Sequence, residues 1–167
     1  MIAADETFDG TWPFEPKFFE GAGFDRIDQG EPAANVRALL EAHLSAVRSN
    51  PAVLRALLRG EVGVDQAASA ILDDDRLDAI CRLCLELGLD PTNSAVILSL
   101  RTWTGAVDEA AVASLDDGGE VTIAQLAEML LRLLHTSLSN LALLDPATDL
   151  TTALAVAKQW QPTFPRD

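Results

Sequence analysis

The stretch ANVRALLEAHLSAVR, residues 34–48, decides the fold class of this 167-residue chain. Its apolar side chains and one histidine recur every three or four positions, at Val36, Leu39, Leu40, His43, Leu44 and Val47. That spacing puts them on one face of an α-helix. The Ser-Asn-Pro sequence over 49–51 predicts that this helix ends there. The stretch therefore predicts an amphipathic helix with one face turned toward a core.

Start and stop signals divide the rest of the chain into further helices. Thr122 and Gln125 match the capping-box pattern, and Pro91 suits the first position of a helix. β-Branched residues alternate nowhere over the length of a strand. The sequence therefore predicts an all-α fold, a compact helical bundle, with helices over 51–59, 65–72, 76–87, 91–103, 108–115, 122–144 and 149–160.

An internal repeat lies within this helical region. VDQAASAILDD, residues 64–74, and VDEAAVASLDD, residues 107–117, are offset by 43 positions. The repeat predicts two copies of a unit with a short helix, an acidic turn and a longer helix. Because each unit alone would leave an apolar face open, we expect two stacked helical hairpins over 64–87 and 107–130. A chance likeness in an Ala- and Leu-rich chain is the alternative.

Charge narrows the choice of partner and of cellular location. The chain has 12 Lys and Arg against 26 Asp and Glu, a net charge of −14. Such a surface repels the phosphates of nucleic acid and favours a basic protein partner. No apolar run has the roughly 18 residues of a membrane span, and the first residues lack the pattern of a signal peptide. We therefore expect a cytoplasmic protein that binds neither nucleic acid nor membrane.

Two cysteines provide the most specific chemical motif. Cys81 and Cys84 have the C-x-x-C spacing of redox dithiols and of half a zinc site. They lie in the middle of a predicted helix, whereas a reactive thiol needs a helix N-terminus or a nearby cation. We expect buried, unreactive thiols; the alternative is a metal or redox site completed by His43 and His135. Since no nucleophile elbow, phosphate loop or dinucleotide motif occurs, we expect no cofactor and no enzymatic activity.

The first 32 residues differ from the rest of the chain. Six of the nine Phe and Trp residues lie in the first 24 positions, among prolines and glycines. This composition predicts an extended arm over 1–32 and a single helical domain over 33–167. Large aromatic side chains must be covered, either by the chain's own helices or by a partner. The candidate partner-binding residues are Trp12, Phe14, Phe18 and Phe19 of the arm and an acidic face of Asp73, Asp74, Asp116 and Asp117.

The sequence FDGTWPFEPKFFEGAGF, residues 8–24, resembles the leader that precedes the first strands of haloalkane-dehalogenase-like α/β-hydrolases. The catalytic elements of that family do not follow, so the resemblance implies a packing or docking segment and no catalytic residue. The sequence as a whole predicts a non-enzymatic, acidic helical interaction protein, such as an adaptor, assembly factor, inhibitor or escort chaperone, that binds another protein. The alternatives are a metal- or redox-active protein and a structural homo-oligomer.

Overall fold

The computed structural model describes residues 30–49, 51, 66–116 and 120–160. Within these ranges the regular structure is helical and no strand occurs, which confirms the predicted all-α fold. The helices are α1 (Pro32–Ser49), α3 (Gln66–Leu87), α4 (Ser94–Ala113), α5 (Ile123–Leu141) and α6 (Thr151–Ala157), followed by the 3₁₀ turn η2 (Lys158–Trp160). None of these helices is long and apolar enough to cross a membrane.

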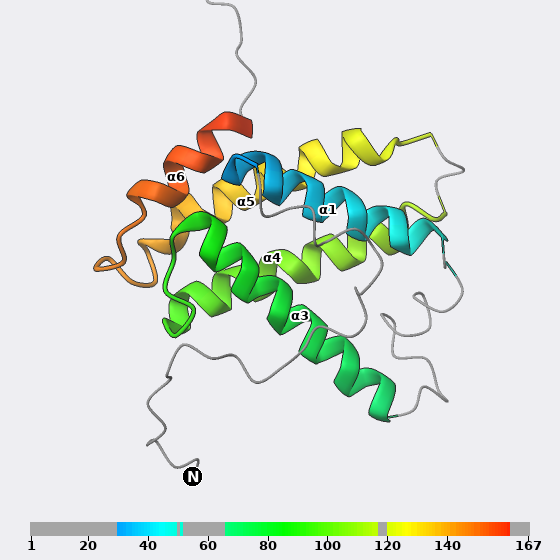
Figure 1. Ribbon diagram of the computed structural model, residues 1–167, viewed down its shortest axis with the longest axis horizontal. Helices are drawn as coiled ribbons and strands as arrows, with labels where there is room; N and C mark the ends of the chain where they lie inside the picture. The colour runs from blue at the N-terminus through cyan, green and yellow to red at the C-terminus, as the bar shows by residue number, and fades with distance from the viewer. Residues whose placement is uncertain (1–29, 50, 52–65, 117–119, 161–167) are drawn as a thin grey trace, which may run out of the picture.

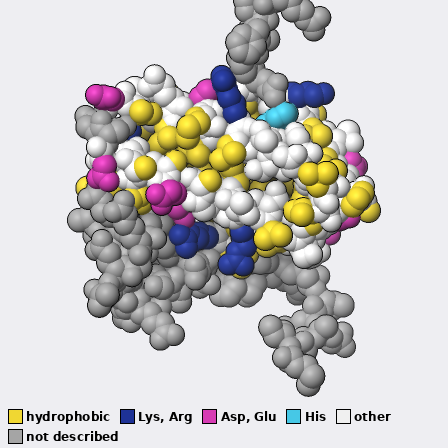
Figure 2. All heavy atoms as spheres, turned by 180° about the vertical axis from the view of Figure 1, so that it is seen from behind, with side chains coloured by type: hydrophobic (Ala, Val, Ile, Leu, Met, Phe, Trp, Pro, Cys, Tyr) yellow, Lys and Arg dark blue, Asp and Glu magenta, His cyan; other side chains and the backbone are white. Residues whose placement is uncertain are grey.

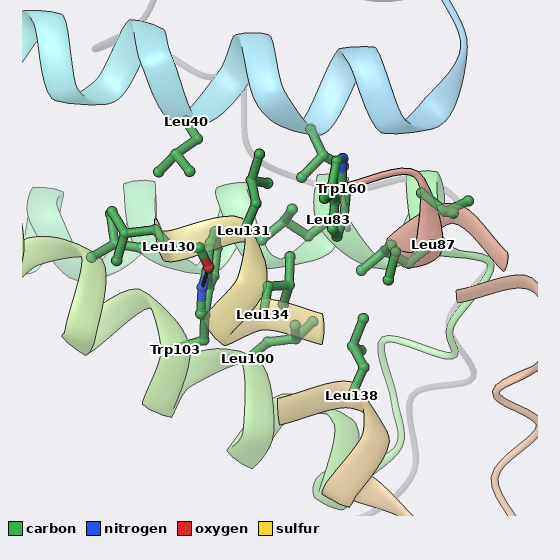
Figure 3. Close-up of a cluster of buried hydrophobic side chains, with 14 of the residues drawn as sticks. Leu40, Leu83, Leu87, Leu100, Trp103, Leu130, Leu131, Leu134, Leu138 and Trp160 are labelled. Atoms are coloured by element: carbon green, nitrogen blue, oxygen red, sulfur yellow. Dashed lines mark hydrogen bonds between the residues drawn. The ribbon is translucent and has the colours of Figure 1, made fainter. Parts of the chain in front are cut away.

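The helices pack around α5. Figure 1 shows α1 and α3 nearest the viewer, α4 and α5 behind them, and α6 at one end of the bundle. Helix α5 packs against α4, α1 and α6, and its inner face supplies a continuous row of buried side chains. Large apolar residues from α1, α3, α4, α5 and η2 meet in one core (Figure 3), including Leu40, Leu83, Leu100, Leu131, Leu134 and Trp160.

Two buried tryptophans join helices by hydrogen bonds as well as by packing. The indole Nε1–H of Trp103 in α4 donates to the carbonyl oxygen of Leu130 in α5 at 2.9 Å. The corresponding group of Trp160 donates to the carbonyl of Ala33 in α1 at 3.1 Å. A buried indole N–H needs such a partner, since an unmade hydrogen bond costs about 1–3 kcal/mol. Trp103 therefore fixes α4 against α5, and Trp160 fixes the end of η2 against the start of α1.

The predicted breaks within α3 and α4 are absent from the structure. Helix α3 runs unbroken through the acidic residues 73–75, where a turn between two helices was expected. The first copy of the repeat is thus one helix, while the second copy spans the end of α4, a connector and the first half of α5. Helix α4 likewise continues through Gly105 and Asp108, so the prediction of a separate helix from Asp108 is wrong.

Other boundaries agree more closely with the sequence. Thr122 and Gln125 form the predicted capping box at the start of α5, with each side chain bonded to the other's backbone N–H. Pro91, however, lies in a turn, and Asn93 caps α4 by accepting from the N–H groups of Ala95 and Val96. Residues 1–29 of the arm predicted over 1–32, and the predicted helix beyond Pro51, lie outside the described residues and stay predictions, while α1 begins at Pro32, the last residue of that arm.

Candidate functional site: a buried polar junction and an exposed helix face

A cluster of three polar residues lies where α1, α3 and α4 meet; we call it the polar junction and define it as His43, Arg76 and Asp108. Asp108 is only 8% exposed. One of its carboxylate oxygens, Oδ2, accepts from Arg76 Nε at 2.9 Å and lies 2.7 Å from Arg76 Nη2. The other oxygen, Oδ1, lies 3.3 Å from His43 Nε2. Asp108 is thus a buried charge whose two oxygens face two different helices.

His43 is incompletely satisfied in this junction. Its contact with Asp108 is within ion-pair distance, but the geometry does not form a hydrogen bond, and the buried Nε2 has no hydrogen-bond partner. A buried nitrogen left in this state costs about 1–3 kcal/mol. Buried polar atoms without partners are rare in folded proteins, and strain, a functional role or a bound water or ion can account for each one. The junction is therefore a candidate site rather than ordinary core packing.

Helix α1 has further polar contacts with its neighbours. Asn35 donates from Nδ2 to both carboxylate oxygens of Glu86 in α3, at 3.1 Å each. Arg37 donates to Glu128 of α5 at 2.7 Å, and its guanidinium, together with that of Arg132, holds the pKa of Glu128 below its ordinary value. Together with the junction, these contacts connect α1 to three helices, so a displacement of α1 would disturb each of them.

An open surface groove runs beside this last contact. Its volume is about 640 Å³, and it is lined by Arg37 of α1 and by Ala124, Gln125, Glu128, Met129 and Arg132 of α5. The arginines are occupied by Glu128, at 2.7 Å from Arg37 and 3.0 Å from Arg132. Both guanidinium groups of the groove are therefore paired with the same carboxylate.

Large apolar side chains are exposed on the outer side of α4 and α5, which we call the α4–α5 face and define by Leu98, Met129 and Leu133. These side chains are 57%, 53% and 40% exposed. Figure 2 shows the side of the molecule opposite to that of Figure 1, where hydrophobic side chains lie in separate groups among white surface. Large apolar side chains exposed on two helices that pack against each other are candidates for a binding surface.

The two cysteines are not reactive groups in this fold. Cys84 is fully buried in α3, and burial raises the pKa of its thiol to about 12, with smaller contributions from Cys81 and Asp90. Burial and the nearby Asp78 also raise the pKa of Cys81. Both thiols are therefore protonated at neutral pH. Within the described residues no three His, Cys, Asp or Glu side chains come together as metal ligands, so the four-residue site with His43 and His135 is not assembled.

The other predicted site residues are only partly described. Asp116 is exposed just after α4, and residues 73 and 74 lie within α3. Asp117 and the four aromatic residues of the arm, Trp12, Phe14, Phe18 and Phe19, lie outside the described residues. Their role stays a prediction. Sequence reasoning missed Arg76 and Asp108, although the position of His43 on the apolar face of its helix was a signal that a buried partner exists.

Comparison with known families gives one finding. Residues 32–136 match a family model described as "Tetracyclin repressor-like, C-terminal domain", which covers more than half of the chain. Comparisons with curated proteins and with solved structures give no match. The matched region includes α1, α3, α4 and most of α5, and therefore all three residues of the polar junction and the whole α4–α5 face.

This finding corrects several predictions. The resemblance to haloalkane-dehalogenase-like hydrolases is wrong as a guide to family, because the matched domain is a helical regulator domain. The adaptor function is also wrong, and neither alternative, the metal or redox protein or the structural homo-oligomer, is supported. The exclusion of nucleic acid was wrong because a repressor acts on nucleic acid, and the charge of one domain does not bear on contacts made by another. A regulator family agrees with the expectation of a non-enzymatic protein.

Proposed function

Since the chain belongs to the Tetracyclin repressor-like, C-terminal domain family, we propose that it is the regulatory domain of a cytoplasmic transcriptional regulator. In this role it has no enzymatic activity, pairs with a second copy of itself and responds to a small ligand. The observation that carries the pairing is the α4–α5 face, where Leu98, Met129 and Leu133 are all at least 40% exposed.

The α4–α5 face has the properties of a surface that associates with its own copy. Interfaces between identical subunits are more apolar than the rest of a protein surface, and full burial of one Leu or Met side chain contributes about 1.5–3 kcal/mol. The two helices that carry the face are also held firmly, because Trp103 of α4 bonds to the backbone of Leu130 in α5. A rigid surface loses little conformational entropy on association.

We place the ligand response at the polar junction. A ligand that offers a hydrogen-bonding group to His43 Nε2 would satisfy the buried atom that has no partner in this structure. Such a ligand would compete for Asp108, which otherwise faces both His43 and Arg76. Because Asp108 belongs to α4, a change in its partners would act on a helix that also carries part of the α4–α5 face.

Sedimentation equilibrium tests the pairing. The wild-type chain should have twice the monomer mass at micromolar concentration, and Leu133→Glu should shift it toward monomer because a charge enters the apolar face. Leu85→Glu is the matched control: it adds the same charge at a leucine that is 78% exposed on α3, outside the face. A wild-type chain that stays monomeric at tens of micromolar, or two variants that dissociate equally, would refute the proposed function.

A further inference from the structure

A glycine lies in the middle of α4, and the described residues give no structural reason for it. Gly105 is exposed, and a Cβ atom built on it would have no heavy atom within 4 Å. Its φ is ordinary, since Gly88 is the glycine with a positive φ in the described part of the chain. A glycine in a helix interior costs about 1 kcal/mol relative to alanine. Neither its backbone conformation nor packing by the described residues accounts for it, whereas close approach of another backbone would.

Two opposite charges flank this glycine at equal spacing. Arg101 lies four residues before Gly105 and Glu109 lies four residues after it, so the three positions form one row along the surface of α4. Both charged side chains are exposed, and neither has an ion-pair or hydrogen-bond partner in the described residues. Arg101 differs in this from the other arginines of the described helices, which have partners: Arg37, Arg48, Arg76, Arg82 and Arg132.

This arrangement is complementary to itself. When two copies of α4 cross antiparallel about a two-fold axis beside Gly105, the position four residues before it in one copy faces the position four residues after it in the other. Arg101 of each chain then faces Glu109 of the other chain, and the pair forms twice. Rows of residues four apart incline by about 26° to the helix axis, so aligning two such rows crosses the helices at about 50°. The absence of a side chain at Gly105 allows the backbones to approach at the crossing point.

We infer that α4 crosses α4 of a second copy at Gly105, fixed by two reciprocal ion pairs between Arg101 of one copy and Glu109 of the other. This inference rests on the proposed function and specifies how the two copies meet. Leu98, two turns before Gly105 and 57% exposed, extends the contact with apolar surface.

The net charge of the chain supports a role for these pairs. Two copies that each carry a charge of −14 repel one another at long range. Association therefore requires opposite charges placed locally within the contact, and Arg101 is a cation of α4 with no partner in its own described part of the chain. A foreign partner would not require its contacts to be symmetric about Gly105, whereas a second copy does.

A charge exchange on the full chain tests this crossing. In Arg101→Glu or Glu109→Arg alone, both ion pairs become like-charge contacts, and we expect the dimer dissociation constant to rise about tenfold. In the double variant Arg101→Glu/Glu109→Arg the pairs re-form with reversed polarity, and we expect a constant within about threefold of wild type. Circular dichroism of each variant checks that the helices are retained. The ion pairs predict a salt-sensitive wild-type dimer.

The outcomes separate this inference from the proposed function. If the wild-type chain dimerises and the single variants do so equally well, the crossing at Gly105 is wrong while the dimeric regulator stands. If the double variant is no better than the singles, the two side chains do not face each other and the crossing is again wrong. If the wild type is monomeric, the proposed pairing itself fails. Gly105→Trp, which blocks close approach of the backbones, should abolish the dimer; a dimer of wild-type affinity would overturn the inference.

Discussion

Replacing Gly105 by alanine should stabilise the isolated chain. Gly105 lies within α4, has an ordinary helical φ and has open space where the alanine Cβ would lie. The methyl group would therefore strain nothing, and the unfolded chain would lose the extra freedom of glycine. We expect the free energy of unfolding to rise by about 0.5–1 kcal/mol, the range for a glycine in an exposed helix interior. For a chain of this length that corresponds to a melting temperature higher by about 1–4 °C.

Gly88→Ala is the matched control, because the same change should have the opposite sign there. Gly88 follows α3 with a φ of +63°, and an added Cβ would lie 3.1 Å from Cγ2 of Thr152. An L-residue in the left-handed region costs about 1–2 kcal/mol, and the close contact adds to this. The glycine at this position is required by the turn that ends α3, as at many helix C-termini. We expect the free energy of unfolding to fall by at least 1 kcal/mol.

Urea denaturation followed by circular dichroism measures both changes, at a protein concentration low enough for the chain to be monomeric. That condition is needed because the methyl group of Gly105→Ala would also hold the two α4 backbones farther apart at the proposed crossing and should weaken the dimer. A loss of stability in the monomeric Gly105→Ala chain would refute the reasoning: it would mean that α4 is interrupted at Gly105, or that part of the chain covers it. Equal effects at the two glycines would show that backbone conformation does not distinguish them.

Three further predictions concern the core, the α1–α5 contact and the thiols. Trp103→Phe should lower the free energy of unfolding by about 2 kcal/mol, from the lost hydrogen bond and the smaller ring, in the same denaturation assay. The pKa of Glu128 is lowered in the folded protein, so the ionised carboxylate stabilises the fold fully above its ordinary pKa of about 4.3. This stabilisation is lost as the pH falls through the folded pKa. Glu128→Gln should therefore reduce the pH dependence of the free energy of unfolding between pH 3 and 7 by up to about 1 kcal/mol. Cys84, with a pKa of about 12, should not react with a thiol reagent at pH 7.5 until urea unfolds the chain, and rapid reaction of the folded protein at Cys84 would contradict its burial.

Local sequence signals predicted the starts of α1 and α5 and failed at the start of α4 and in the helix interiors. The period of α1 and the capping box of α5 act through residues close in sequence, so both could be predicted. The break expected at residues 73–75 is absent although aspartate is a weak helix former, and the break expected at Gly105 is absent because an interior glycine costs only about 1 kcal/mol. Burial of Val107 and Ala111 on the far side of that glycine offsets this cost and keeps α4 continuous. Tertiary packing of this kind cannot be read from a single stretch.

The candidate site was harder to predict than the fold, because its residues come from different helices. His43 signalled a buried polar partner, but nothing in the sequence identified Asp108 and Arg76, which are distant along the chain. Leu98 and Leu100 are equally apolar and only two residues apart, yet Leu98 is exposed on the α4–α5 face and Leu100 is fully buried. An Ala- and Leu-rich helix does not reveal which apolar residues remain outside the core.

Helix α4 carries both proposed roles, which gives the domain a direct physical connection between them. Asp108, on its inner side, faces His43 and Arg76; Glu109, the next residue, is exposed and lies in the row proposed to meet the second copy. The α-helix transmits a rotation or shift along its whole length, because its backbone hydrogen bonds keep adjacent residues in register. A ligand that changes the partners of Asp108 and thereby shifts the backbone of α4 would also move Glu109 and Gly105. The same argument predicts that Asp108→Asn, which removes the buried charge, changes the dimer dissociation constant although residue 108 is buried within its own chain; an unchanged constant would show that the junction and the crossing are independent.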